Sequence, residues 1–336
     1  MKDSASIVVA GDGQMGLVMA SIALEAGATS VTVWGPFSDQ VNSLAETRMS
    51  DRLPGWQVPE GISFTDDAAR FANADIAVNA IPTQFIRTTW SRIAPHLRPD
   101  VLVVSTAKGL EIETGKRPSE ILLEATERPD LAEATISGPT IASELMQRLP
   151  AVMLAASPDP IQAARVHTAF GTHWLRIYES NDLVGVELAG ALKNVIALAA
   201  GMCDGLGLGF NAKSALLARG LAEMARFGVA AGAARETFFG VAGVGDLATT
   251  CFSPDGRNRS CGEAIGKGAS LDEYIAQSRC VVEGVPTVSS VLRQAAEYGV
   301  DMPITRAIGR ILFEGVSPKD AIAELMQRPA TDEGLS

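Results

Sequence analysis

The spacing of hydrophobic residues changes once along the chain, near residue 180. Before that point, short apolar runs alternate with stretches of helical periodicity; the runs are SIVVAG, SVTVWG, ADIAVNAIP, DVLVVSTAKG, EATISGP, PAVMLAAS and HWLRIYES. Continuous apolar runs separated by helices are typical of a parallel sheet with both faces covered. The pattern therefore predicts an α/β first domain over residues 1–180.

After residue 180 the chain consists of long segments rich in Ala, Leu and Gly, with few strand signals. In NAKSALLARGLAEMARFGVAAG the apolar residues recur at helical spacing, and Asn211 is a candidate cap for the start of that helix. We therefore expect an all-α second domain over residues 181–336.

The first apolar run leads directly into a GxGxxG loop, with Gly11, Gly13 and Gly16 at the spaced positions. The first glycine permits a tight turn, the second lets the backbone approach a pyrophosphate, and the third allows close packing of helix on strand. The N-terminus of the following helix attracts the anion. Glycine-rich turns are common without a ligand, but one that follows the first strand of a βαβ pattern indicates dinucleotide binding.

The residues after the second apolar run bear on the choice between NAD and NADP. NAD sites usually have Asp or Glu there for the ribose hydroxyls, and NADP sites have a nearby Arg. Here the run ends in Trp34-Gly35-Pro36, and no acid follows until Asp39. A missing carboxylate removes a repulsion against a 2′-phosphate, so the sequence leans slightly to NADP(H). The side chains available to receive that phosphate are Ser38, Arg48 and Arg52.

Composition narrows the classes of partner. A net charge of −11 over 336 residues argues against a nucleic-acid surface or an anionic membrane as the main partner. No uninterrupted apolar run approaches the ~18–20 residues of a membrane span, and the first residues lack the pattern of a signal peptide. The 4 cysteines form no CxxC pair and no metal-ligand spacing. We expect reduced thiols, no metal and a cytoplasmic protein.

One charged residue stands out in the apolar second half. GALKNVIALAAG carries Lys193 and Asn194, and between residues 185 and 201 the only other charge is Glu187. Burying an ammonium group is costly without a partner, and no acid lies at i±3 or i±4 from Lys193. Asp246, in the glycine-flanked GVGDL, is the candidate partner. The alternative is a Lys193 side chain that extends into solvent.

Longer motifs extend this picture: AIPTQFIR, STAKGLE, ISGPTIASELMQRLPAVMLAAS, VGVELAGALKNVIALAAGMCDGLGLGFNAKSALLARGLAEMARFG, AGVGDLATTCFSPDGRNRS, VVEGVPT and VDMPITRAI. In kind and order they resemble the NAD(P)-dependent glycerol-3-phosphate dehydrogenase family of the bacterial type, over nearly the whole chain. The resemblance implies a Rossmann-like dinucleotide-binding domain followed by an α-helical substrate domain. It also implies interconversion of dihydroxyacetone phosphate and sn-glycerol 3-phosphate with NAD or NADP, which supplies glycerophospholipid synthesis.

The resemblance assigns roles to individual residues. It implies that Lys193 is the proton donor and acceptor, and that Lys108 and Asp246 belong to the same catalytic set. The implied substrate-binding residues are Lys108, Gly138, Thr140, Lys193, Asn194, Asp246, Thr250, Gly256, Arg257 and Asn258. The implied cofactor-binding residues are Gly11, Gly13, Gln14, Met15, Gly16, Pro36, Lys108, Ala142, Arg257, Val281 and Glu283.

The chain departs from the family's usual pattern in three places. Gln14 and Met15 stand where bacterial members often have Ser and an aromatic residue, and Pro36 stands where Arg or His is frequent. These two departures bear on cofactor preference and not on the reaction. Gly256 stands where Ser often precedes the Arg-Asn pair; some members share this change, and a backbone amide remains for a phosphate.

The chemistry suits these residue types. Reduction of a ketone needs a hydride and a proton for the developing alkoxide, and a lysine ammonium supplies both the proton and positive charge. The guanidinium of Arg257 matches a phosphate, although the same fork accepts a carboxylate. All 3 histidines precede residue 180, so the second domain lacks the His–Asp pair of many 2-hydroxyacid dehydrogenases.

Other interpretations stay open on the sequence alone. The chain could act on another small phosphorylated or carboxylated hydroxy compound, or could be a non-catalytic nucleotide-binding relative, although such a relative would be expected to lose Lys108, Lys193 or Asp246. Taken singly, Arg257 suits a solvated turn, Asp246 a helix cap and Lys108 an exposed loop. A small phosphorylated substrate and a homodimer are the expected partners.

Overall fold

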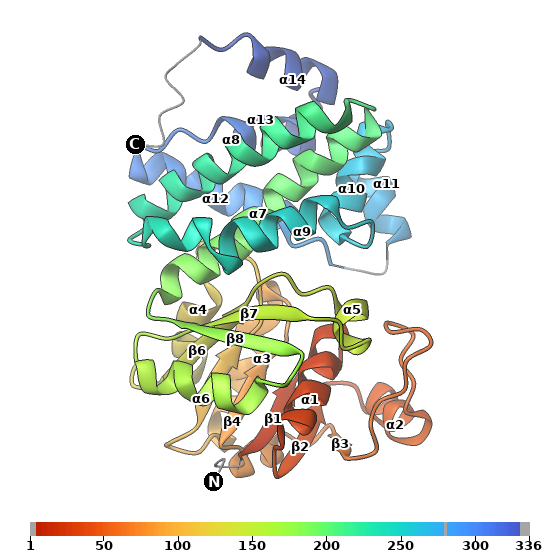
Figure 1. The fold of residues 1–336 in the computed structure, drawn as a ribbon, viewed down its shortest axis with the longest axis vertical. Helices are drawn as coiled ribbons and strands as arrows, with labels where there is room; N and C mark the ends of the chain where they lie inside the picture. The colour runs from red at the N-terminus through yellow and green to blue at the C-terminus, as the bar shows by residue number, and fades with distance from the viewer. Residues whose placement is uncertain (1–4, 279–280, 330–336) are drawn as a thin grey trace. The chain divides into compact units, whose positions relative to one another are not determined.

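The structure, a computed structural model, describes residues 5–278 and 281–329, and it divides into two units (Figure 1). The first unit contains the described residues up to Ala107 together with Lys116–Leu183, and the second contains Lys108–Gly115 together with the described residues from Val184 onward. The division falls between Leu183 and Val184, whereas the sequence pattern placed the boundary after residue 180. No pattern predicted that Lys108–Gly115 would belong to the second unit.

The first unit is built on a sheet with strand order β3-β2-β1-β4-β5-β6-β7-β8. Neighbours from β3 through β6 run parallel, and so do β7 and β8. Strand β1 lies between β2 and β4, where the chain order reverses direction, and α/β sheets bind ligands at such points. The strands are β1 (Ser6–Ala10), β2 (Ser30–Trp34), β3 (Ile62–Thr65), β4 (Ile76–Asn79), β5 (Leu102–Ser105), β6 (Ala132–Ser137), β7 (Ala151–Ala156) and β8 (Leu175–Ser180).

The expected parallel arrangement does not extend across β6 and β7, which run antiparallel, with Thr135 opposite Ala156 and Ser137 opposite Leu154. The helix in their connection, α5 (Ala142–Met146), is roughly 8 Å long at 1.5 Å per residue. A six-residue strand is about 20 Å long. The connection between β6 and β7 contains only this short helix, and β7 returns beside β6 in the opposite direction.

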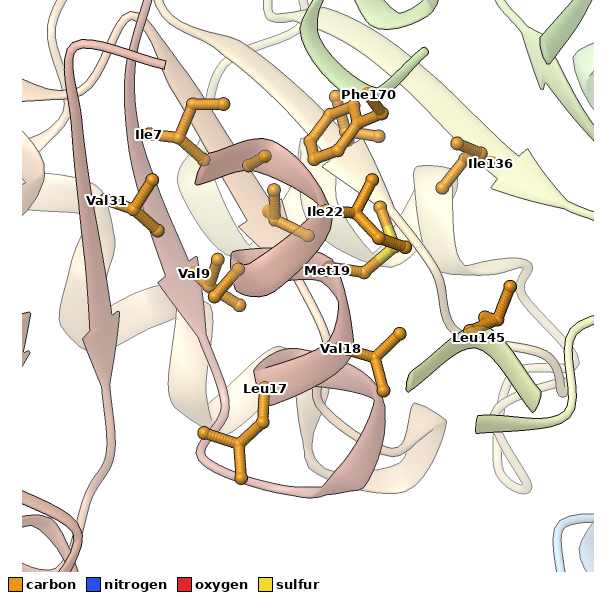
Figure 2. Packing of buried hydrophobic residues seen from close by; sticks show 14 of the residues in the cluster. Ile7, Val9, Leu17, Val18, Met19, Ile22, Val31, Ile136, Leu145 and Phe170 are labelled. Atoms are coloured by element: carbon orange, nitrogen blue, oxygen red, sulfur yellow. The ribbon is translucent and has the colours of Figure 1, made fainter. Parts of the chain in front are cut away.

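Helices cover both faces of the sheet, as the apolar runs predicted. Alternate residues of β1 enter different cores: Ile7 and Val9 pack in one cluster, and Val8 and Ala10 in another with Trp34. In the first cluster, Leu17, Val18, Met19 and Ile22 of α1 lie against the sheet (Figure 2). The helices of this unit are α1 (Gln14–Ala26), α2 (Ser38–Thr47), α3 (Ile86–Ile93), α4 (Pro118–Thr126), α5 and α6 (Pro160–Phe170), with short turns η1 (Ala68–Asn73), η2 (Thr83–Phe85) and η3 (Ala94–His96).

The described part of the second unit is helical, as predicted. Helix α8 begins at Gly209 after Leu208 in the cap position, so Asn211 lies inside the first turn and the prediction that it caps the helix was wrong. The elements are α7 (Leu183–Gly205), α8 (Gly209–Ala230), η4 (Arg235–Phe239), η5 (Val241–Gly245), α9 (Asp246–Phe252), α10 (Arg257–Gly266), α11 (Leu271–Gln277), α12 (Gly284–Tyr298), α13 (Pro303–Glu314) and α14 (Pro318–Met326) (Figure 1).

Helix α7 forms the centre of the second core. Within the described ranges it is the one helix long and apolar enough to cross a membrane by length and composition, but 94% of that apolar window is buried inside the protein. Glycines bring α7 and α10 into close contact. A Cβ on Gly201 would lie 1.9 Å from the Arg259 carbonyl oxygen, and one on Gly262 would lie 2.0 Å from that of Leu198. The apolar composition of α7 is therefore that of a core helix.

Candidate functional site

The second unit gathers the three predicted catalytic residues into one hydrogen-bonded cluster. Asp246 lies between two lysines: Lys193 Nζ donates to its Oδ1 at 2.6 Å, and Lys108 Nζ donates to its Oδ2 at 2.6 Å. Lys193 is 6% exposed and Asp246 is 1% exposed, so the alternative of a Lys193 side chain in solvent is wrong. Two ammonium groups and one carboxylate leave one positive charge in excess.

A distorted helical turn places Asp246 in this position. The segment η5 is a turn of π-helix, and α9 begins directly after it with Asp246. A Cβ on Gly243 would lie 2.0 Å from the Phe238 carbonyl oxygen, so this turn requires glycine there. Single π-turns within helices occur frequently at functional sites. The glycines around GVGDL thus allow the turn that directs a buried carboxylate at the two lysines.

Burial and neighbouring charges set the protonation of Lys193. Burial lowers the pKa of Lys193 to about 8; Asp246 opposes this shift, and the like charge of Lys108 adds to it. Lys193 Nζ also donates to Thr250 Oγ1 at 2.7 Å, and that hydroxyl donates to the Asp246 carbonyl oxygen at 2.7 Å. The result is an oriented ammonium group that can exchange its proton near neutral pH.

A chain of side-chain amides connects the elements around the lysines. Asn194 Nδ2 donates to the Lys108 carbonyl oxygen at 3.0 Å, and Asn258 Nδ2 donates to Asn194 Oδ1 at 2.9 Å. The Gly284 amide donates to Asn258 Oδ1 at 2.9 Å. These bonds link Lys108–Gly115, α7, α10 and α12. The predicted residues Asn194 and Asn258 therefore hold the site together.

Helix α12 supplies anchors that sequence reasoning missed. Ser290 Oγ donates to the Glu111 carbonyl oxygen at 3.1 Å, Arg293 Nη2 to that of Ile112 at 3.0 Å, and Gln294 Nε2 to that of Gly115 at 3.1 Å. These three side chains fix the segment that carries Lys108. They lie at i, i+3 and i+4 on one helix face, and that polar spacing was the signal available in the sequence.

The two arginines of GRNR differ in their surroundings. Arg259 Nε donates to Asp204 Oδ2 at 2.8 Å, and its Nη2 pairs with Glu263 at 3.0 Å. Arg257 is the first residue of α10 and is exposed, with a long contact of 3.4 Å from its Nη1 to the Val281 carbonyl oxygen. Gly256 is the cap residue of α10. Arg257 and the helix N-terminus together suit an anion such as phosphate.

The glycine loop in the first unit fits a dinucleotide. Gly11 has φ of 119°, in the region that favours glycine, and a Cβ on Gly16 would lie 1.9 Å from the Gly11 carbonyl oxygen. Gly13 caps α1, and the helix begins with Gln14 and Met15. The turn therefore presents backbone without side chains at the N-terminus of a 13-residue helix, next to the switch point of the sheet.

The other predicted residues of the first unit lie at the carboxyl ends of its strands. Pro36 follows β2. Gly138, with φ of 142°, follows β6, and Thr140 Oγ1 donates to its carbonyl oxygen at 3.1 Å. Ala142 is the first residue of α5. All of these residues lie within the first unit. Their ligand roles stay predictions.

The last two predicted cofactor residues lie just before α12. Val281 is 37% exposed and Glu283 is 9% exposed just before α12. In the part of the chain that the structure describes, no group of three or more His, Cys, Asp or Glu residues could hold a metal ion. Cys203, Cys251 and Cys261 are buried free thiols, and Cys280 lies outside the described residues.

Comparison with known proteins agrees with both units. Models of the NAD-dependent glycerol-3-phosphate dehydrogenase N-terminus and C-terminus match residues 6–163 and 182–323. A glycerol-3-phosphate dehydrogenase [NAD(P)+] of Streptomyces griseus is 42% identical, with 97% of each chain covered, and one of Streptomyces coelicolor is 42% identical, with 99% of each covered. A crystal structure of glycerol-3-phosphate dehydrogenase from Coxiella burnetii is similar with a TM-score of 0.91 and 31% identity, covering 97% of this chain and 99% of that one.

Proposed function

The chain belongs to the NAD-dependent glycerol-3-phosphate dehydrogenase family and interconverts dihydroxyacetone phosphate and sn-glycerol 3-phosphate with NAD(P)H, and we propose that Lys193 donates and accepts the proton. The observation that carries this proposal is the buried contact of Lys193 with Asp246, in which Lys108 holds the other carboxylate oxygen. A non-catalytic relative would have no need of this cluster.

The cluster suits proton transfer because Asp246 keeps a cationic partner, Lys108, after Lys193 has given up its proton. A reduced nicotinamide, when bound, would supply the hydride to the carbonyl carbon. The Lys193 ammonium would donate its proton to the carbonyl oxygen as negative charge develops there. After the transfer, Lys108 and Asp246 remain as an ion pair with no net charge. With Lys193 alone, the same step would leave a buried carboxylate without a cation, which is costly. Thr250 holds Nζ in place through its hydroxyl.

The substrate phosphate is assigned to the start of α10. The exposed Arg257 guanidinium forks onto two phosphate oxygens, and the backbone amides after Gly256 add further donors. Asn194 and Asn258 keep α7 and α10 in register for this contact. Gly138 and Thr140 of the first unit are further proposed substrate-binding residues.

The cofactor is assigned to the glycine loop, with its pyrophosphate at the N-terminus of α1. The further proposed cofactor residues are Gln14, Met15, Pro36, Lys108, Ala142, Arg257, Val281 and Glu283. We also propose that the protein is a cytoplasmic homodimer and that its product supplies glycerophospholipid synthesis.

The test is oxidation of NADH and of NADPH by the purified protein, followed by nicotinamide absorbance, with dihydroxyacetone phosphate or unphosphorylated dihydroxyacetone as substrate. The expected result is turnover that depends on the phosphate group. Equal turnover of the two ketones would contradict the phosphate assignment, and no turnover of either with both cofactors would contradict the proposed function.

A further inference from the structure

A buried carboxylate oxygen without a hydrogen-bond partner lies beside the residue that follows β2. Asp12 occupies the first variable position of the glycine loop, and its Oδ2 is fully buried with no partner among the described residues. A Cβ on Gly35 would lie 2.8 Å from that oxygen. Gly35 directly follows β2, so its missing side chain leaves the space that the Asp12 carboxylate fills.

This position has a known role in dinucleotide sites. An acid at the end of the second strand accepts hydrogen bonds from the adenosine ribose of NAD. In this chain β2 itself ends without an acid, and Asp12 brings a carboxylate to the same place from the loop that follows the neighbouring strand β1. A buried carboxylate oxygen without a partner is unfavourable, and a ribose hydroxyl would satisfy it. Burial raises the pKa of Asp12, while its own backbone amide and the Arg52 charge oppose that shift.

Two of the side chains that the sequence offered for a 2′-phosphate, Ser38 and Arg48, make other contacts in the structure. The Ser38 hydroxyl donates to the Asp66 carboxylate, which adds a second acid near β2. Arg48 donates to the Ile62 carbonyl oxygen and lies over the Phe64 ring at 5.3 Å. The polar groups of Ser38 and Arg48 therefore already have partners within the first unit.

Arg52 is exposed and lies at the glycine loop. Its Nη1 would be 3.2 Å from a Cβ on Gly13, the glycine that permits approach of the pyrophosphate. Gln14 Nε2 donates to the Arg52 carbonyl oxygen at 3.2 Å and so ties this segment to α1. The positive charge is thus nearest the pyrophosphate position, and the negative charge of Asp12 is nearest the ribose position.

We propose that Asp12 determines cofactor specificity: its carboxylate accepts a hydrogen bond from the adenosine ribose hydroxyls and repels a 2′-phosphate, so the protein prefers NADH to NADPH. This inference rests on the proposed dinucleotide site. It reverses the slight lean to NADP(H) that the absence of an acid after β2 had suggested, because a linear pattern does not show that a loop residue fills the position of a strand-end residue.

The test measures dissociation constants of NADH and NADPH by titration calorimetry, without substrate, for the full chain. We expect the unaltered protein to bind NADH at least about tenfold more tightly, as one charge-assisted hydrogen bond allows. Asp12→Asn keeps the shape and removes the charge, so it should reduce that ratio about tenfold. Asp39→Asn is the matched control: it removes an exposed acid of α2 and should leave the ratio unchanged.

Three results would overturn the inference: equal or tighter binding of NADPH by the unaltered protein, an unchanged ratio in Asp12→Asn, or an Arg52→Ala variant that loses affinity for NADPH alone. Arg52→Ala should instead weaken both dinucleotides together. The ratio in the unaltered protein needs no variant, so misfolding of Asp12→Asn leaves the test intact. Binding of neither dinucleotide would contradict the proposed function itself, which separates the two failures.

Discussion

The lysine cluster of the second unit and the glycine loop of the first unit are built on opposite plans. In the lysine cluster, buried side chains satisfy one another: Asp246 holds two ammonium groups, and Asn194 and Asn258 hydrogen-bond together. At the glycine loop, missing side chains create the shape, and one carboxylate oxygen is left without a partner. In the lysine cluster, the contacts fix the position and the pKa of the Lys193 ammonium group. At the glycine loop, backbone groups stay exposed and can bind a ligand.

This comparison predicts that substitutions in the two regions affect different measured quantities. Changes to the lysine cluster should alter kcat and its pH dependence, while changes to the loop should alter dinucleotide binding.

The largest effect is expected from Lys193→Ala. Loss of the general acid should lower kcat by at least ~10² and leave the dissociation constant of NADH nearly unchanged. The two readouts are steady-state turnover of dihydroxyacetone phosphate and calorimetric binding of NADH. Lys267→Ala, which removes a largely exposed lysine paired with Glu263, is the control and should retain kcat. An unchanged kcat in Lys193→Ala would show that this lysine is only structural.

Gly16→Ala tests the shape of the loop. The added Cβ would lie 1.9 Å from the Gly11 carbonyl oxygen, so the turn must shift. We expect dinucleotide affinity to fall roughly tenfold to a hundredfold, in line with the cost of overpacking, while the pH dependence of kcat at saturating cofactor stays the same. Gly240→Ala is the control, because a Cβ there meets its nearest atom at an ordinary 3.5 Å. Unchanged affinity in Gly16→Ala would contradict the assigned loop.

Arg257→Ala tests the phosphate contact at the start of α10. Removal of a charge-assisted contact should raise the KM for dihydroxyacetone phosphate about tenfold, with a smaller change in kcat. The matched control is Arg306→Ala, on α13, where an exposed arginine pairs with Asp301. If Arg257→Ala weakened only cofactor binding, the substrate-phosphate role would be wrong.

The smallest expected effect is a shift of the pH profile. Reduction needs protonated Lys193, so kcat for reduction should fall as the pH rises through about 8, while kcat for glycerol 3-phosphate oxidation rises over the same range. Lys108→Met removes the like charge that lowers the Lys193 pKa, so both limbs should move to higher pH. The readout is the pH dependence of kcat in each direction, beside Lys319→Met as a surface control. A shift to lower pH would contradict the described coupling.

The sequence predicted most of the fold because its signals were strong and local. Seven strands were visible as apolar runs, whereas β3 has the four residues ISFT, too few to show a period. The reversal at β7 depends on the path of a connection, and the membership of Lys108–Gly115 in the second unit depends on long-range hydrogen bonds to α12. Neither property is encoded by the spacing of residues within an element.

The candidate sites were predictable to different degrees for the same reason. An isolated lysine in an apolar helix requires a partner, and the glycine-flanked GVGDL offered Asp246, so this partner could be named from the sequence. Its second contact with Lys108, and with it the depressed Lys193 pKa, required coordinates. The proposed role of Asp12 could not be predicted from the sequence, because it depends on the absence of a side chain at Gly35, which follows a different strand.

The glycine contacts between α7 and α10 also fix the distance between these two helices. Lys193 lies on α7 and Arg257 on α10, so the distance between these helix axes sets the span between the proposed proton donor and the proposed phosphate-binding group. Gly201 and Gly262 hold that distance near its minimum, since any Cβ at either position would collide with the opposite backbone. The proposed site thereby measures the length of its substrate, and a short carbon chain between carbonyl and phosphate is what such a span selects.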